Sequence, residues 1–152
     1  MKKIVTTLIV AGLLLVGLRA DAQIKPTEAG LEKYKWKKRP LLLFAPSEDS
    51  PAYIRQKEMV KADAQAIEER DMVVIELVGP DKVYIGGTLQ RRQRGEALRK
   101  RFRVSPDSFA VLLIGKDGTE KSRNTAPVAL EEIFGRIDQM PMRRQEMRGN
   151  DN

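Results

Sequence analysis

Residues 39–78 carry the sequence RPLLLFAPSEDSPAYIRQKEMVKADAQAIEERDMVVIELV, and this stretch decides the fold. The apolar run 41–45 is closed by Pro46, which is typical of a strand covered on both faces. Ser50 and Pro51 predict a helix start, with a hydroxyl cap and proline at the first helical position, and the helix is expected to reach about Glu69. Residues 72–78 are dense in β-branched side chains and predict a second strand. Two strands joined by one helix form a parallel βαβ unit with a right-handed crossover.

The chain beyond this unit continues with shorter elements. We expect a short strand at 83–85, a short helix at 96–102, a third buried strand at 109–114 and, after the turn at Asp117-Gly118, a polar edge strand at 119–123. A last helix opens near Pro127 and ends at Met140-Pro141, because the residue before proline avoids helical angles. This order predicts an α/β domain of the thioredoxin-like class, with a mixed central sheet of about four strands and helices on both faces. Another small α/β sandwich with a different strand order is the alternative.

The N-terminal segment 1–22 is predicted to be a signal peptide. Two lysines precede an apolar stretch at 4–18, and Ala20-Asp21-Ala22 supplies the small residues of a cleavage site, so cleavage is expected after Ala22. The alternative is an uncleaved anchor, but the apolar stretch is shorter than the ~20 residues a membrane helix needs. We therefore expect a periplasmic or secreted protein with no transmembrane span after cleavage.

The mature chain divides into three parts by composition. Residues 23–38 form a polar lead-in, from which Leu31, Tyr34 and Trp36 are available to dock on the domain. Residues 39–141 form the domain itself. Residues 142–152 are expected to be a charged tail that is frayed.

The composition excludes several chemistries. The 152 residues include no cysteine and no histidine, so thiol–disulfide exchange, thiol peroxidase chemistry and a structural zinc cage are excluded. We expect no cofactor and no metal. Three methionines, Met140, Met142 and Met147, are an alternative candidate for a Cu(I)-binding site, because thioether sulfur is a Cu(I) ligand. Such residues more often fill gaps against a hydrophobic core.

Four stretches in order resemble a known family. They are YKWKKRPLLLFAP at 34–46, ERDMVVI at 69–75, LLIGKDG at 112–118 and IDQMPMRR at 137–144. Together they resemble a thioredoxin-like domain of unknown function (domain of unknown function 4174). That family is found in bacterial exported proteins and, in animals, in sushi-repeat-containing and other extracellular-matrix proteins. The resemblance covers residues 31–148 and implies a fold and a location outside the cytoplasm, but no reaction.

The comparison with thioredoxins locates a lost redox site. Those enzymes place Cys-X-X-Cys between the first strand and its helix, where the helix N-terminus stabilises a thiolate. Counting from Phe44, the corresponding residues are Asp49, Ser50, Pro51 and Ala52. Asp49 and Ser50 are expected to act as helix caps here. Pro106 lies near the place of the thioredoxin cis proline, but three residues separate it from the apolar run, so no cis bond is assigned to it.

A dense basic segment is the candidate binding surface. Arginine guanidinium groups carry a positive charge and can donate two parallel hydrogen bonds, which suits a phosphate or sulfate ligand. The candidate anion patch comprises Arg91, Arg92, Arg94, Arg99, Lys100, Arg101 and Arg103. Expected partners are an anionic glycan, a lipid headgroup or an envelope protein, whereas nucleic acid is disfavoured because no aromatic residues interleave for base stacking. The alternative is a solvated face that only keeps the protein in solution. A second cluster comprises Arg136, Arg143, Arg144 and Arg148.

Three functions remain open from the sequence. The first is an exported, redox-inactive binding or accessory module that recognises an anionic ligand or an envelope protein through arginine-rich surfaces. The second is a carboxylate-dependent enzyme that uses the Asp49 region, with Glu48 or Asp117 as the second acid. The third is a structural accessory subunit of an envelope complex whose methionine-rich tail folds on a partner. No catalytic residue is assigned, because no motif demands one and Asp117 is explained by its turn.

Overall fold

The computed structural model describes residues 30–90 and 95–150. They form one six-stranded sheet in the order β4-β3-β2-β1-β5-β6. The central strands are β1 (Arg39–Ala45), β2 (Met72–Val78) and β5 (Ala110–Ile114). β1 and β2 pair in parallel with Arg39 opposite Met72, and β5 pairs antiparallel to β1. The outer strands are β3 (Lys82–Ile85), β4 (Thr88–Leu89) and β6 (Glu120–Asn124).

The predicted parallel βαβ unit is confirmed, but the expected number of strands is too low. The sheet extends beyond β2 as a short β3–β4 hairpin, whose turn contains Gly86 and Gly87, both with positive φ. The predicted strand at 83–85 corresponds to β3, whereas β4 was missed because its two residues are too few to show an alternation of apolar and polar side chains.

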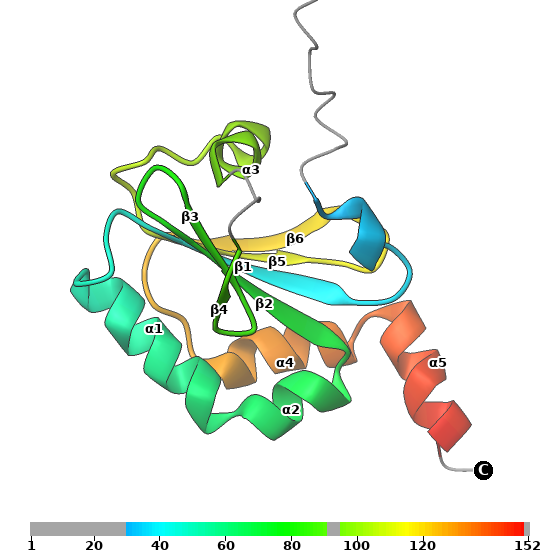
Figure 1. Ribbon diagram of the computed structural model, residues 1–152. Coiled ribbons are helices and arrows are strands. Elements are labelled where there is room, and N and C mark those ends of the chain that lie inside the picture. Colours follow the sequence, from blue (N-terminus) through cyan, green and yellow to red (C-terminus); the bar gives the residue numbers. More distant parts are fainter. Residues whose placement is uncertain (1–29, 91–94, 151–152) are drawn as a thin grey trace, which may run out of the picture.

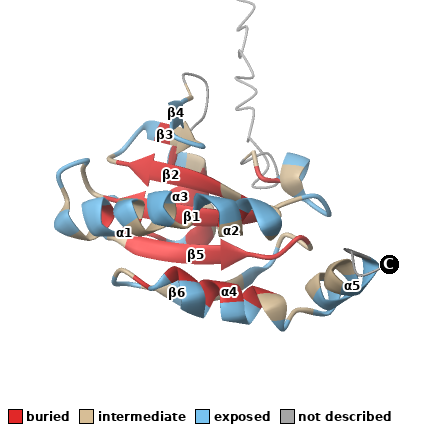
Figure 2. Cartoon of the chain, turned by 90° about the horizontal axis from the view of Figure 1, so that it is seen from below, coloured by how far each residue is buried: buried red, intermediate tan, exposed pale blue. Residues whose placement is uncertain are grey.

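Helices cover both faces of the sheet (Figure 1). α1 (Pro51–Ala62), α2 (Ala64–Glu69) and α4 (Leu130–Asp138) lie on one face, and α3 (Gly95–Phe102) lies on the other with the short 3-10 helix η2 (Glu32–Tyr34). Alternate residues of each central strand therefore enter two separate cores. On β1, Leu41 and Leu43 pack towards α4, while Leu42 and Phe44 pack towards α3. Figure 2 shows β1, β2 and β5 largely buried, whereas the outward faces of the helices, the β3–β4 hairpin and the loops are exposed.

The first long helix differs from the prediction in two ways. It begins at Pro51 as expected, but the Ser50 side chain makes no capping hydrogen bond; instead the Ser50 carbonyl accepts from the Ile54 amide at 3.0 Å. The expected single helix also breaks at Asp63, where φ is −108° and ψ is 27°. Aspartate competes with the backbone for hydrogen bonds, which makes it a poor residue for a helix interior.

The C-terminal segment is helical, so the expectation of a frayed tail is wrong. α5 (Pro141–Asn150) starts directly after the end of α4, because Pro141 stops one helix and occupies the first position of the next. No α5 residue is fully buried among those with described side chains, and Figure 2 shows the helix at the margin of the molecule. Polar contacts described below attach it to the domain.

The lead-in docks in part as predicted. Leu31 is buried and Tyr34 packs against the core on the α3 side. Trp36 does not dock: 61% of it is exposed. The predicted signal peptide 1–22, residues 23–29 and residues 151–152 lie outside the described residues. Pro106, like the rest of the described chain, has no cis peptide bond.

Candidate functional site

The carboxyl edge of the sheet is where loops from three strands meet. β1 and β2 run parallel and end at the same edge, and β5 begins there because Ala110 lies opposite Phe44. The loops 46–50, 79–81 and 103–109 therefore gather at one place. In open α/β sheets, ligands bind in the crevice outside the carboxyl ends of the strands. The predicted position of the lost redox motif lies at this edge.

The residues at that position form an ordinary loop and helix start. Asp49 is exposed, and its pKa is lowered by a hydrogen bond from the Ser47 side chain and by one from its own backbone. Ser50 is partly buried, Pro51 is exposed and Ala52 is partly buried at the start of α1. A hydroxyl and a carboxylate there cannot perform thiol exchange.

Glu48, next to this position, is held in a surface cluster. Its carboxylate accepts hydrogen bonds from Tyr84 Oη at 2.5 Å and from Lys82 Nζ at 3.0 Å. The bond from Tyr84, followed by that from Lys82, lowers the pKa of Glu48. Glu48 is therefore ionised at neutral pH and already paired, which suits a structural carboxylate better than a proton donor.

A second carboxylate is buried beneath α1. Glu76 lies in the middle of β2 with 4% of its surface exposed, and its carboxylate accepts a hydrogen bond from the Tyr53 hydroxyl. Lys57 Nζ lies 3.2 Å from Glu76 Oε2 and 3.1 Å from the Tyr53 oxygen. Burial, and then the Glu76 bond, raises the pKa of Tyr53, which keeps its hydroxyl neutral as a donor. The sequence reasoning missed this cluster; the available signal was a single acid inside the apolar strand 72–78.

Arg99 lies inside the domain, which corrects the expectation that it is part of an exposed patch. It is 4% exposed, and its guanidinium donates to the carbonyls of Ala45 at 2.8 Å, Leu77 at 2.9 Å and Ser105 at 3.0 Å. It also lies over the Phe44 ring at 5.4 Å. Burial lowers the pKa of Arg99. Its donors tie the ends of β1 and β2 to the loop before β5.

The buried arginine forms the floor of an open groove of about 550 Å³ at the carboxyl edge. Lys100 and Arg103 are exposed on its wall, and Glu96 is the acidic residue among the lining side chains. The remaining lining residues are Pro80, Val104, Ser105 and Pro106. We call this feature the basic groove.

The other predicted anion ligands lie elsewhere. Arg101 points away from the basic groove: its guanidinium donates to the Gly118 carbonyl at 3.4 Å and lies over the Phe102 ring. Arg91, Arg92 and Arg94 lie outside the described residues. The structure thus brings together Arg99, Lys100 and Arg103 and separates Arg101 from them.

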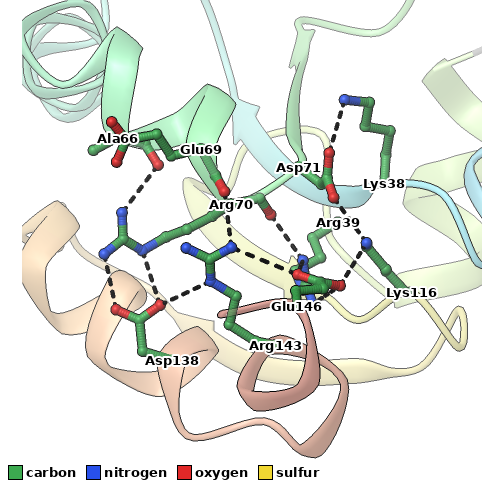
Figure 3. A network of polar contacts seen from close by, with 10 residues as sticks. All are labelled: Lys38, Arg39, Ala66, Glu69, Arg70, Asp71, Lys116, Asp138, Arg143 and Glu146. Atoms are coloured by element: carbon green, nitrogen blue, oxygen red, sulfur yellow. Dashed lines mark hydrogen bonds and ion pairs between the residues drawn. The ribbon is translucent and has the colours of Figure 1, made fainter. Parts of the chain in front are cut away.

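The opposite edge of the sheet carries a network of charged contacts that attaches α5 (Figure 3). Glu146 of α5 accepts two hydrogen bonds from Arg39, at 3.0 and 3.2 Å, and one from Lys116 at 2.7 Å. Lys116 also contacts Asp71 at 2.9 Å. Burial acts to raise the pKa of Glu146, but the bonds from Arg39 and Lys116 outweigh it and lower the pKa.

The second predicted basic cluster is partly absorbed by this network. Arg143 donates to Asp138 and to the Glu69 carbonyl, and Arg70 forms a two-pronged contact with Asp138 at 3.1 and 2.8 Å. Arg136, Arg144 and Arg148 are exposed. Residues 30–90 and 95–150 contain no group of three or more acidic side chains placed to hold a metal ion. In the same residues, no helix has the length and apolar character to cross a bilayer.

Comparison with solved structures identifies the fold. Thioredoxin peroxidase I from Plasmodium yoelii superposes with a TM-score of 0.53 at 15% identity, over 76% of this chain and 79% of that one. A second Plasmodium yoelii structure, Prx1a modified at its N-terminus, gives a TM-score of 0.52 at 16% identity and covers 76% of this chain and 80% of the other. The predicted thioredoxin-like class is therefore confirmed.

Comparison with curated sequences identifies relatives that are much longer. The chain is 32% identical to coiled-coil domain-containing protein 80 from Danio rerio, over 86% of this chain and 17% of the relative. It is 27% identical to the sushi repeat-containing protein SRPX2 from Homo sapiens, over 86% of this chain and 29% of the relative. The chain thus spans less than a third of these relatives. Residues 30–146 match the model of one family, and the chain belongs to that family, the domain of unknown function DUF4174.

Proposed function

We propose that this chain is an exported, redox-inactive thioredoxin-like module that binds an anionic ligand in the basic groove. The observation that carries the proposal is the groove of about 550 Å³ at the carboxyl edge of the sheet, lined by Arg99, Lys100 and Arg103 with Glu96 as the acidic residue. The ligand group is a sulfate or phosphate oxyanion, carried by a glycan or a lipid headgroup.

The arrangement of the cations supports this ligand class. Lys100 and Arg103 are exposed, so their charged groups are available to an incoming anion. Arg103 is held in the left-handed region at φ 53°, and its amide donates to the Lys100 carbonyl at 3.3 Å. Beneath them, the buried guanidinium of Arg99 donates to three neutral carbonyls. Its positive potential therefore adds to that of the two exposed cations.

The carboxylate-enzyme alternative has weaker support at this edge. Hydrogen bonds lower the pKa values of both Glu48 and Asp49, so neither is poised to donate a proton at neutral pH. Asp117 is occupied by its turn, where it contacts Thr119 and Lys121. An Asp49→Asn variant that retains every activity found for the mature chain would agree with this view.

Export after cleavage of residues 1–22 is part of the proposal. The mature protein recovered from the producing cell is expected to start at Gln23, which N-terminal sequencing tests. A protein that keeps residue 1 and stays with the cytoplasmic fraction would contradict export.

The groove is tested by salt elution from a heparin resin. Lys100→Glu together with Arg103→Glu should lower the salt concentration at which the mature chain elutes, because affinity for a polyanion depends on the number of contacts that replace counterions. The matched control is Arg55→Glu with Lys61→Glu, which makes the same charge change on exposed positions of α1. Equal elution of the two double variants would reject the groove as the binding site. A third variant, Arg91→Glu with Arg92→Glu and Arg94→Glu, tests the neighbouring segment.

A further inference from the structure

The turn that leads into β1 presents an exposed tryptophan among lysines. Residues 33–38 read KYKWKK, and Trp36 is the one tryptophan of the chain. It is 61% exposed, although the buried core on the α3 side contains its neighbours Leu31 and, in part, Tyr34. In Figure 1 this turn, between η2 and β1, lies at the margin of the molecule.

The backbone of this turn is fixed on both sides of Trp36. The Trp36 amide donates to the Lys116 carbonyl at 2.6 Å. The amides of Lys37 and Lys38 both donate to the Tyr34 carbonyl, at 2.9 and 2.8 Å. Trp36 has φ 64°, a left-handed conformation that is costly for a bulky side chain. The fold therefore holds the indole outwards in an unfavourable conformation, and strain of this kind clusters at functional sites.

Exposed lysines flank Trp36 on both sides in the sequence. Lys33, Lys35 and Lys37 are all exposed, and none of them forms an ion pair within the described part of the chain. Lys38 contacts Asp71 at 3.3 Å. Residues 33–38 contain no acidic residue, and Glu32 directly precedes them. The turn is thus an aromatic tip with a strong excess of cations.

We propose that this turn docks on an anionic lipid bilayer, with Trp36 in the interface and Lys33, Lys35 and Lys37 against the headgroups. Tryptophan prefers the bilayer interface, because its ring is apolar and its N–H remains hydrated. Lysines close to an anionic leaflet add electrostatic attraction. An exposed turn suits a flat surface, whereas small ligands are bound in concave sites, and the basic groove is lined by other residues.

This surface is separate from the basic groove. The turn precedes the amino end of β1, and the groove lies beyond its carboxyl end. Seven strand residues separate the two, which corresponds to about 20 Å. A variant in one surface is therefore not expected to change binding at the other.

The single tryptophan makes the test direct. The mature chain is mixed with phosphatidylcholine vesicles that contain or lack a quarter of phosphatidylglycerol, and Trp36 emission is recorded. Binding to the anionic vesicles should shift the emission to shorter wavelength, and lipids brominated on their acyl chains should quench it. Zwitterionic vesicles and heparin should do neither. Absence of the emission shift with anionic vesicles would overturn the proposal. A shift that heparin produces and vesicles do not would also overturn it and would indicate a glycan site.

Variants separate charge from insertion. Lys33→Gln, Lys35→Gln and Lys37→Gln together should lower vesicle partitioning in sedimentation about 100-fold, since each basic residue near an anionic surface contributes about fivefold. Trp36→Ala should lower it about tenfold through lost apolar burial. The matched control is Arg55→Gln with Lys61→Gln and Arg136→Gln, all exposed. Equal partitioning of the two triple variants would refute the proposal. Lys100→Glu with Arg103→Glu should leave the Trp36 emission shift intact, because that shift reports on the turn itself, so failure of the groove and failure of the turn are distinguishable.

Discussion

Neutralising Glu146 tests whether one carboxylate attaches the C-terminal helix. Glu146→Gln keeps the size of the side chain but removes the charge that faces Arg39 and Lys116, which are 1% and 8% exposed. Arg39 would retain its bond to the Arg70 carbonyl at 2.9 Å, and Lys116 would retain Asp71 at 2.9 Å. In the variant, both buried cations therefore lose the negative charge of Glu146, but each keeps one hydrogen-bond partner.

The expected loss is smaller than that for a fully buried ion pair. Removing one partner of a buried pair costs about 3–5 kcal/mol. Glu146 is 25% exposed and the glutamine still accepts a hydrogen bond, so we expect a loss of about 2 kcal/mol in the free energy of unfolding. For a domain of this size, that corresponds to a melting temperature lower by about 8 °C.

Urea unfolding of the mature chain provides the measurement, with Glu131→Gln as the control because Glu131 is exposed on α4 and forms no ion pair in the described chain. A chain truncated after Met140 gives the cost of removing all of α5. Glu146→Gln is expected to account for most of that cost, since no residue of α5 with a described side chain is fully buried. A midpoint equal to that of Glu131→Gln would refute this account of how α5 is held.

The same network predicts a dependence on pH. Hydrogen bonds from Lys116 lower the pKa of Asp71, and the bonds from Arg39 and Lys116 lower that of Glu146 in spite of its burial. Groups with a lowered folded pKa contribute stability that is fully present above their ordinary values of 3.8 and 4.5 and is lost as the pH falls through the folded values. The free energy of unfolding should therefore fall below about pH 5, and it should fall less steeply in Glu146→Gln. Parallel curves for the two chains would contradict the assignment.

Three further substitutions have distinct expected effects on urea unfolding. Arg99→Met should lower the free energy of unfolding by about 3 kcal/mol, because it leaves three carbonyls without their charged donor. Lys100→Met, on the exposed wall of the groove, is the control. Equal urea midpoints for the two variants would contradict a structural role for Arg99. Tyr53→Phe should lower the free energy of unfolding by about 1–3 kcal/mol, because it removes the hydroxyl that donates to buried Glu76. An unchanged urea midpoint would contradict that hydrogen bond. Gly118→Ala should cost about 1–2 kcal/mol, because φ is 81° there, although a Cβ would meet the Lys35 side chain only at an ordinary contact distance of 3.9 Å. A neutral effect would show that the turn relaxes.

The sequence was most informative where apolar residues run without interruption. The strand runs 41–45 and 72–78 are long and contain no polar break apart from Glu76, and Pro51 and Met140-Pro141 mark helix limits by sterics that do not depend on the rest of the fold. These features predicted the βαβ unit, the α/β class and the end of the last core helix. They failed for the two-residue strand β4, which is too short to show a pattern, and for α5, which is attached by contacts with residues far away in the chain.

The candidate site shows the same division. The basic composition of 91–103 is visible in the sequence, but a charge run does not reveal which side chains face outwards. Arg99 and Lys100 are adjacent in sequence, yet one is buried against three carbonyls and the other is exposed on the groove wall. Adjacent positions on a helix point about 100° apart, so the packing of α3 on the sheet decides their roles.

By itself, the sequence determined what this protein lacks and what it is built from: without cysteine or histidine it has no thiol chemistry, and its apolar runs specify two parallel strands around a helix. The tertiary structure alone decided which charges are structural and which are available. Arg39, Glu76, Arg99 and Lys116 became internal partners because folding removed them from water, where a charge persists only with compensating contacts. Trp36 was expected to dock on the domain because its side chain is apolar. It stays exposed to solvent because the backbone of its turn is held in the left-handed region.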